Sequence, residues 1–140
     1  MRILGIDFGE ARIGIAVSDP LGITAQALET IHWSGEWKKP LTRIKELVDS
    51  YKCTKLVVGL PGNMNGTLGE RGRRTQQFIK KLQDIIPDAE IITWDERLST
   101  AQSKQMLIAM GINSKRHKEK IDQMAASIIL QSYMDAQSVC

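Results

Sequence analysis

Carboxylates stand at the ends of three apolar segments of this 140-residue sequence, and they are the side chains best suited to chemistry. Asp7 closes the run ILGID, Asp95 and Glu96 follow EIITW, and Asp122 begins a final helical pattern. Strand ends and helix starts are where a sheet protein gathers side chains from distant positions. Grouped carboxylates repel one another unless cations neutralise them, and such hard oxygen ligands favour Mg²⁺ or Mn²⁺. Two such ions can activate water and stabilise the leaving oxygen of a phosphodiester.

Some of these acids also have an ordinary structural interpretation. Asp95 and Glu96 can be solvated loop residues, and Asp122 can cap a helix or interact with its dipole. Asp7 is harder to explain in this way, because an acid within ILGIDFG brings no obvious gain in solubility or capping. Spacing alone therefore leaves the metal site as a hypothesis.

The last helical segment indicates how Asp122 can approach the other acids. Its side chain shares one helical face with Ala125, Ala126 and Ile129, at spacings of one and two helical turns. Two small residues beside the acid would let this face lie close to a sheet. An ordinary close contact between helix and sheet is the alternative, and the two interpretations are compatible.

Positive charge is concentrated in two short segments. Residues 71–81 and 115–120 hold nine of the 19 Lys and Arg residues and a single acid, although the net charge of the chain is only +3. This segregation favours a polyanion as the partner, and two solvated basic surfaces are the alternative. The residues expected to contact nucleic-acid phosphates are Arg71, Arg73, Arg74, Lys115, Arg116 and Lys118.

The composition is that of a globular protein with one core. An apolar fraction of 42% over 140 residues fits a single domain spanning residues 1–140. No apolar run approaches the roughly 18 residues of a membrane span, and Asp7 and Glu10 interrupt the region of a signal peptide, so we expect a cytoplasmic protein. Two cysteines and two histidines form no common zinc framework, and neither Cys53 nor Cys140 is expected to be a nucleophile.

Hydrophobic periodicity predicts an α/β domain with one mixed sheet and helices packed on it. The expected strands are residues 2–8, 12–18, 23–30, 55–60 and 90–94. The expected helices are residues 36–51, 75–86, 99 or 100 to 110, and 119–134. The first three strands follow one another as a meander.

A glycine-rich loop separates the fourth expected strand from its following helix. Within residues 61–72 it contains Gly62, Gly66, Gly69 and Gly72. Such a loop is typical of a flap that becomes ordered when substrate binds. An inert surface connection is the alternative interpretation.

Four motifs in the sequence together resemble one family. They are GIDFGEARIGIAVSD, VVGLPGNMNGTLG, WDERLST and KIDQMAASIIL, and they cover nearly the whole chain in the family's order. The sequence is similar to the YqgF (RuvX) nucleases, relatives of the RuvC Holliday junction resolvases.

The resemblance implies an RNase H-like fold with an antiparallel three-strand meander, and a metal-dependent endonuclease. It implies an acidic site at Asp7, Glu96 and Asp122 holding Mg²⁺ or Mn²⁺, with Arg12 and Arg97 facing phosphate or ordering the site. It also implies structured RNA as substrate, in maturation of the 5′ end of precursor 16S ribosomal RNA. Whether the protein is a monomer or a homodimer stays open.

Three other functions are considered. A DNA junction resolvase is the alternative within the same class, and it would need a two-fold dimer with paired cleavages. The D-x-G motif also opens the phosphate loop of the actin and sugar-kinase fold, but that fold needs two lobes and a second glycine-rich motif. A non-catalytic RNA-binding or ribosome-associated module would gain nothing from clustered carboxylates.

Overall fold

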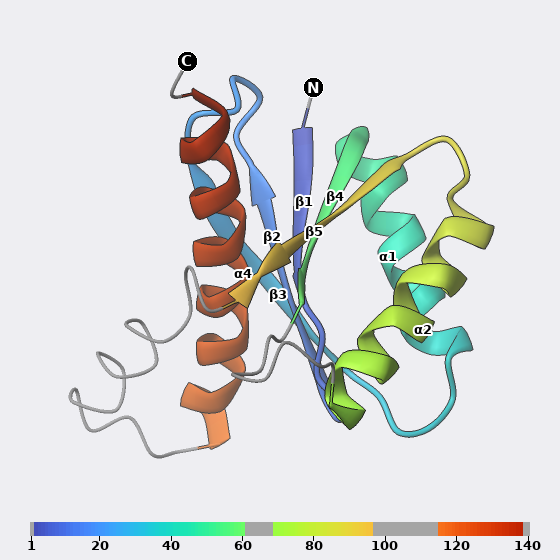
Figure 1. The fold of residues 1–140 in the computed structure, drawn as a ribbon. Helices are drawn as coiled ribbons and strands as arrows, with labels where there is room; N and C mark the ends of the chain where they lie inside the picture. The colour runs from blue at the N-terminus through green and yellow to red at the C-terminus, as the bar shows by residue number, and fades with distance from the viewer. Residues whose placement is uncertain (1, 61–68, 97–114, 139–140) are drawn as a thin grey trace.

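Five strands form one mixed sheet at the centre of the molecule, in the order β3-β2-β1-β4-β5 (Figure 1). The computed structural model describes residues 2–60, 69–96 and 115–138, the last range with side chains from Lys120 to Gln137. The strands are β1 (Arg2–Asp7), β2 (Arg12–Ser18), β3 (Ala25–His32), β4 (Cys53–Leu60) and β5 (Glu90–Asp95). Pairing is antiparallel for β1–β2 and β2–β3 and parallel for β1–β4 and β4–β5, which confirms the predicted meander and mixed sheet.

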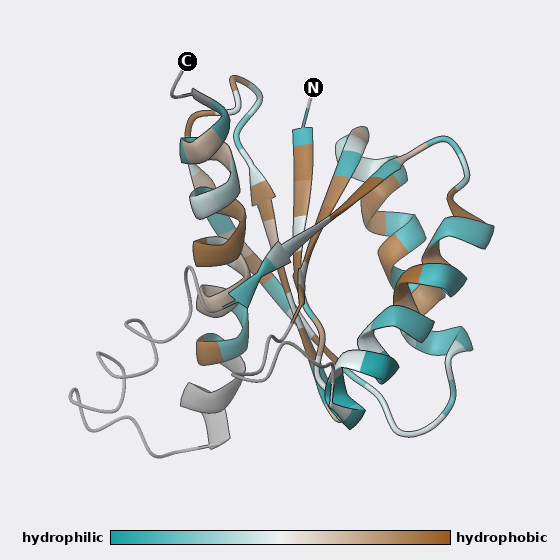
Figure 2. Ribbon diagram, in the orientation of Figure 1, coloured by the Kyte–Doolittle hydropathy of each residue, from teal (hydrophilic) through white to brown (hydrophobic). Residues whose placement is uncertain are grey.

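Helices cover both faces of this sheet (Figure 1). One face carries α1 (Lys38–Tyr51) and α2 (Glu70–Ile85), and the other carries α4 (Lys115–Ser138). Figure 2 shows hydrophobic colour along the strands and on the helix sides that face them, with hydrophilic colour outward. Within the described residues, no helix is both long enough and apolar enough to cross a membrane.

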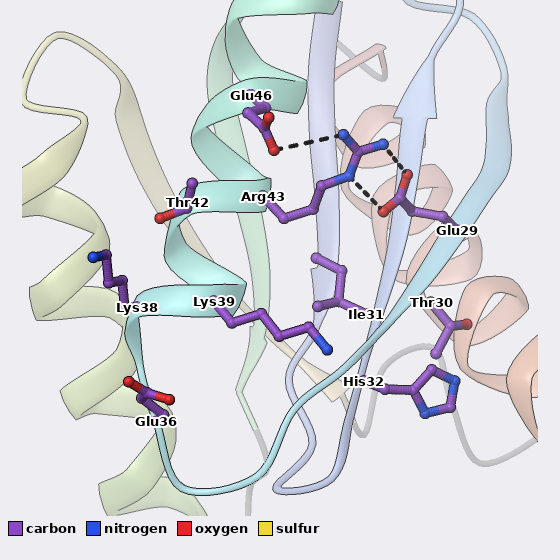
Figure 3. Close-up of a pocket in the computed structure, with 10 residues that line it drawn as sticks. All are labelled: Glu29, Thr30, Ile31, His32, Glu36, Lys38, Lys39, Thr42, Arg43 and Glu46. Carbon is purple, nitrogen blue, oxygen red and sulfur yellow. Dashed lines mark hydrogen bonds and ion pairs between the residues drawn. The ribbon is translucent and has the colours of Figure 1, made fainter.

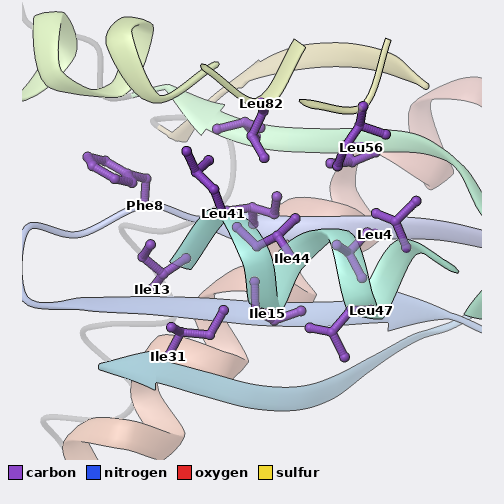
Figure 4. Close-up of a cluster of buried hydrophobic side chains, with 14 of the residues drawn as sticks. Leu4, Phe8, Ile13, Ile15, Ile31, Leu41, Ile44, Leu47, Leu56 and Leu82 are labelled. Carbon is purple, nitrogen blue, oxygen red and sulfur yellow. The ribbon is translucent and has the colours of Figure 1, made fainter. Parts of the chain in front are cut away.

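The two faces of β1 have different neighbours because side chains alternate along a strand. Leu4, Ile6 and Phe8 belong to the large apolar cluster under α1 and α2 (Figure 4). Ile3 packs against the cluster under α4, and Gly5 lies so close to α4 that a Cβ there would be 2.7 Å from the Cβ of Leu130. Asp7 therefore points to the α4 face.

Two helices begin earlier than the periodicity predicts. The helix expected from residue 75 begins at Glu70, because Gly69 takes an extended backbone before it and Glu70 places a negative charge in the positive first turn. The helix expected from residue 119 begins at Lys115. The helix expected from residue 99 or 100 to 110 lies outside the described residues.

The third strand begins two residues later than predicted. The backbone N–H groups of Ile23 and Thr24 donate to Oδ1 of Asp19, at 2.7 and 2.9 Å, and this holds them in the turn before β3. These bonds keep the pKa of Asp19 below its usual value, with the Thr24 bond as the largest cause. Asp19 thus serves the turn, as its position before Pro20 predicts.

Candidate active site

Asp7 ends the central strand and has a glycine beside it on each neighbouring strand. It pairs with Gly14 across β1–β2, and the register that pairs Ile6 with Val58 brings Gly59 next to it on β4. Paired residues point to the same face of a sheet, so all three positions face α4. Asp7 is buried, with 7% of its surface exposed. The absence of side chains at the two glycines opens space on either side of the carboxylate.

Asp122 occupies the space above Gly14. A Cβ at Gly14 would run into the main-chain carbonyl of Asp122. Ala125 and Ala126 are also buried, and a Cβ at Gly5 would lie 3.0 Å from the carbonyl oxygen of Ala126, so this helix lies close to the sheet as predicted. Asp122 lies inside α4, well after Lys115, so the prediction that it begins the helix is wrong and a capping role does not apply.

Glu96 shares the corresponding space beside Gly59 with the side chain of Ile129. It directly follows β5, and a Cβ at Gly59 would lie 3.0 Å from both Cγ and Oε1 of Glu96. Glu96 is buried, with 6% of its surface exposed, so the alternative of a solvated loop residue is excluded for it. Asp95 pairs with Leu60 at the strand end and by alternation points to the opposite face from Trp94.

Two arginines accompany the three acids. Nε of Arg12 donates to Oδ2 of Asp122 at 2.6 Å, which joins the start of β2 to α4. Nη2 of Arg71, in the first turn of α2, lies 3.9 Å from Oδ1 of Asp7 and 3.8 Å from Oε1 of Glu96. The fold thus brings together five residues from five elements or their ends, with positive charge beside each carboxylate.

The acidic residues fit a divalent cation by chemistry and by backbone position. Carboxylate oxygens are the ligands that Mg²⁺ and Mn²⁺ prefer, and the glycines let Asp122 and Glu96 approach the strand that carries Asp7. As the side chains stand, no three His, Cys, Asp or Glu residues among those described are gathered closely enough to hold a metal. Asp122 is turned toward Arg12, and Arg71 stands between Asp7 and Glu96. Metal binding by these acids therefore requires their side chains and those of the two arginines to move.

The other basic residues take different positions. Arg73 is exposed, whereas the guanidinium of Arg74 lies 5.0 Å from the ring centroid of Trp37 and 3.7 Å from a carboxylate oxygen of Glu10. Arg97 lies outside the described residues, as do residues 61–68 of the expected flap. The α4 backbone includes positions 115, 116 and 118, whose side chains are not among those described. The last residues of the expected flap, from Glu70 to Gly72, belong to α2.

Aromatic side chains support the turn after Asp7 from the α1 and α2 side. Phe8 stacks on Phe78 with ring centroids 4.5 Å apart and contacts Trp33 and Trp37. The indole N–H of Trp33 donates to the carbonyl of Gly9 at 2.9 Å. A Cβ at Gly9 would meet the carbonyl of Arg12. Gly9 therefore allows the backbone on the two sides of this turn to come close together.

Some features of this site are not evident from the residue pattern. The residue pattern does not distinguish Gly14 and Gly59 from other glycines, and it predicts Arg71 at phosphate rather than between two acids. Period-two alternation does place Gly5 and Asp7 on the same face of the first strand, so the sequence indicates that this face carries a glycine beside the acid. The position of Arg71 has no comparable signal, because it depends on how α2 meets the sheet.

A separate hollow of about 670 Å³ lies between β3 and the first half of α1 (Figure 3). Arg43 makes two hydrogen bonds to Glu29 there, at 2.7 and 2.9 Å, and they raise the pKa of Arg43. Residues of the acidic site do not line it. Cys53 is also no candidate for chemistry, because burial raises the pKa of its thiol to about 11.

Known proteins are similar to nearly the whole of this chain. Residues 1–136 match the family model described as "RuvX: Holliday junction resolvase". A protein of Acetivibrio thermocellus named "Putative pre-16S rRNA nuclease" is 53% identical over 137 residues, which is 98% of this chain and 97% of the relative. A protein of the same name from Bacillus thuringiensis is 46% identical over 138 residues, covering 98% and 100%.

Solved structures share the fold at low sequence identity. Thermus thermophilus RuvC in complex with a Holliday junction substrate superposes with a TM-score of 0.65 at 14% identity, covering 99% of this chain and 97% of that one. The yeast mitochondrial Holliday junction resolvase Ydc2 gives 0.58 at 12% identity, covering 97% and 78%. These likenesses establish the RuvC-like, RNase H-like architecture.

Proposed function

Because this chain belongs to the RuvX family, we propose that it is a metal-dependent endonuclease that processes the 5′ end of precursor 16S ribosomal RNA in the cytoplasm. It is a hydrolase of phosphodiester bonds, in keeping with its family and its relatives named as nucleases. One observation supports the proposal most: Asp7, Glu96 and Asp122 converge on the α4 face around two glycines. Buried carboxylates of this kind give a domain little stability, so a role in chemistry explains their position better.

In this proposal the three acids hold Mg²⁺ or Mn²⁺ through their carboxylate oxygens. The bound cation supplies charge that activates water and neutralises the leaving oxygen. Hydrolysis joins the water oxygen to phosphorus and breaks the phosphorus–oxygen bond to one nucleoside, whose oxygen then takes a proton. Glu96 or Asp7 orients the attacking water, and Asp122 completes the ligand set.

The arginines act on the phosphate in this proposal. Arg12 is 37% exposed at its side chain, so it can reach solvent while it orients Asp122. Arg73 and the basic positions at the start of α4 supply contacts to the nucleic-acid backbone farther from the site. A guanidinium suits this role because its planar donors match phosphate oxygens.

A DNA junction resolvase is the alternative, favoured by the shared fold with RuvC bound to a junction. It requires two copies of the site to make paired cuts on a two-fold symmetric substrate. A non-catalytic RNA-binding module is the other alternative. It leaves the buried Asp7 and Glu96 without a use, because carboxylates repel the phosphates that such a module binds.

Cleavage assays separate these functions. Purified protein is incubated with precursor 16S RNA and with a four-way DNA junction, each in Mg²⁺, Mn²⁺ or EDTA, beside Asp7→Asn as the matched control. We expect metal-dependent RNA cleavage by the wild type alone. Symmetric cuts in the junction with intact RNA would replace the proposal by the resolvase. Binding without cleavage in every metal would support the non-catalytic module.

A further inference from the structure

Arg71 stands where a cation is needed by two acids at once. Its Nη2 lies 3.9 Å from Oδ1 of Asp7 and 3.8 Å from Oε1 of Glu96. The acid side chains are only 9% and 8% exposed, whereas that of Arg71 is 47% exposed. Arg71 is thus paired with buried charge while about half of its own side chain remains exposed.

At these distances Arg71 forms ion pairs with Asp7 and Glu96 but no short hydrogen bonds to them. Charged hydrogen bonds measure about 2.7–2.9 Å, and both Arg71 distances are about 1 Å longer than this. The bond from Arg12 to Asp122, at 2.6 Å, is by contrast a short charged hydrogen bond. Arg71 therefore neutralises Asp7 and Glu96 without fixing their oxygens in place. Such a cation can be replaced by another one with little loss of hydrogen bonding.

A divalent cation held by Asp7 and Glu96 would exclude Arg71 from its present position. A metal bound to Asp7 and Glu96 would stand against the guanidinium, and like charges that close repel strongly in a poorly hydrated site. Release of Arg71 from the site leaves its guanidinium on the solvent side, in the first turn of α2, where the positive helix end also attracts anions. A phosphate oxygen there would hold Arg71 by a charged hydrogen bond.

We propose that Arg71, the described residue that pairs with both Asp7 and Glu96, is a resident cation of the metal-free site and exchanges with the divalent metal when a nucleic-acid phosphate binds it. This inference rests on the proposed function of the acidic site. Arg71 is a positioning residue here, because it acts on the reaction through the charge of Asp7 and Glu96. Phosphate and metal should then raise each other's affinity by the same factor, because each binds more tightly once Arg71 has left Asp7 and Glu96.

Mn²⁺ affinity measured by calorimetry tests the exchange without any need for turnover. Arg71→Gln removes the competing cation, so we expect it to bind Mn²⁺ about tenfold more tightly than the wild type in the absence of RNA. Lys80→Gln removes the same charge from an exposed position of the same helix and is the matched control. It should bind Mn²⁺ as the wild type does. Equal or weaker binding by Arg71→Gln would overturn the proposal.

The coupling to phosphate gives a second readout. A short single-stranded RNA should tighten Mn²⁺ binding to the wild type, and a peptide nucleic acid of the same sequence, which lacks phosphates, should not. Arg71→Gln should lose this coupling and Arg71→Lys should retain it, because lysine keeps the exchangeable charge. If RNA tightened Mn²⁺ binding to Arg71→Gln as much as to the wild type, the exchange would be contradicted. Gel analysis after each titration confirms that the RNA is intact.

Asp7→Asn separates failure of this inference from failure of the proposed function. If Asp7→Asn weakens Mn²⁺ binding and Arg71→Gln matches the wild type, the metal site stands and only the exchange is wrong. If Asp7→Asn binds Mn²⁺ as the wild type does, the metal is bound elsewhere and the proposed function fails with it. Circular dichroism melts of all variants confirm that each is folded.

Discussion

Asp7 and Gly14 face each other across the antiparallel pair β1–β2, and the space that a side chain at Gly14 would fill is taken by the backbone of Asp122. On the other side of Asp7, the side chains of Ile129 and Glu96 fill the space beside Gly59. Acids from three distant parts of the sequence are therefore adjacent because two strand positions lack side chains. The candidate site depends on these absences as much as on the acids.

Replacing the acids tests whether they act together. Asp7→Asn keeps the shape but removes a metal ligand, so cleavage of precursor RNA should fall by orders of magnitude in single-turnover assays. Glu96→Gln and Asp122→Asn should behave alike, and two changes combined should lower the rate little beyond either alone. Asp95→Asn is the neighbouring control and should be milder. Full activity of Asp7→Asn would contradict the carboxylate site.

The two glycines beside Asp7 should respond differently to alanine. Gly14→Ala places a methyl group against the main chain of α4, which cannot yield easily, and should lower the free energy of unfolding by about 1–3 kcal/mol. Gly59→Ala meets the ends of two side chains, Ile129 and Glu96, which can move. It should lower activity more than stability, because Glu96 is displaced. Urea unfolding beside cleavage rates measures both, and equal losses in the two variants would contradict this account.

The Arg12–Asp122 ion pair has a matched counterpart far from the acids. Arg12→Gln should lower the free energy of unfolding by about 0.5–1 kcal/mol, since the pair is half-exposed, and should also reduce cleavage. Arg43→Gln breaks the Arg43–Glu29 pair on the other face, with a similar loss of stability and unchanged cleavage. A parallel loss of activity in both variants would show that the effect of Arg12 is only structural.

Salt dependence tests the expected phosphate contacts of α2. Reversing the charge at Arg73 and Arg74 should weaken RNA binding and reduce the log–log slope against salt by about 0.7 for each phosphate of a single strand that is no longer neutralised. Arg73→Glu alone should account for much of this change, because Arg73 is exposed whereas Arg74 packs on Trp37. Affinity is measured by fluorescence anisotropy over a range of salt. An unchanged slope would place the RNA elsewhere on the surface.

The thiol of Cys53 gives a pH-dependent readout of folding. Burial raises its pKa from 9.0 to about 11, so its reaction with a disulfide reagent near pH 8 should be slow in the folded protein and fast in urea. The unfolded chain loses the proton first, so this contribution to stability is complete below pH 9 and disappears as the pH rises toward 11. A Cys140→Ser background isolates Cys53. Rapid labelling of the folded protein would contradict its burial.

Much of the architecture is encoded locally and was predictable. Alternation fixes β1, β2 and the side of β1 on which Asp7 lies, and the apolar runs ending at Leu60 and Asp95 predict two further strands. Period-two and period-3.6 patterns are short-range properties, so a sequence displays them directly. The resemblance of four motifs then led to the family and the acidic positions. Helix starts were less certain, since backbone choice near Gly69 depends on what α2 packs against.

The order of residues alone was enough to predict the strands and the mixed sheet, and the family resemblance implied the three acids. Three other features became visible only in the folded chain: Gly14 and Gly59 flank Asp7, Asp122 lies inside a helix, and Arg71 stands between Asp7 and Glu96. These three features could not be predicted from the sequence, because strand register and helix docking bring together residues that are far apart in the chain. The partner of a long charged side chain is therefore set by distance in space, which no local pattern of residues records.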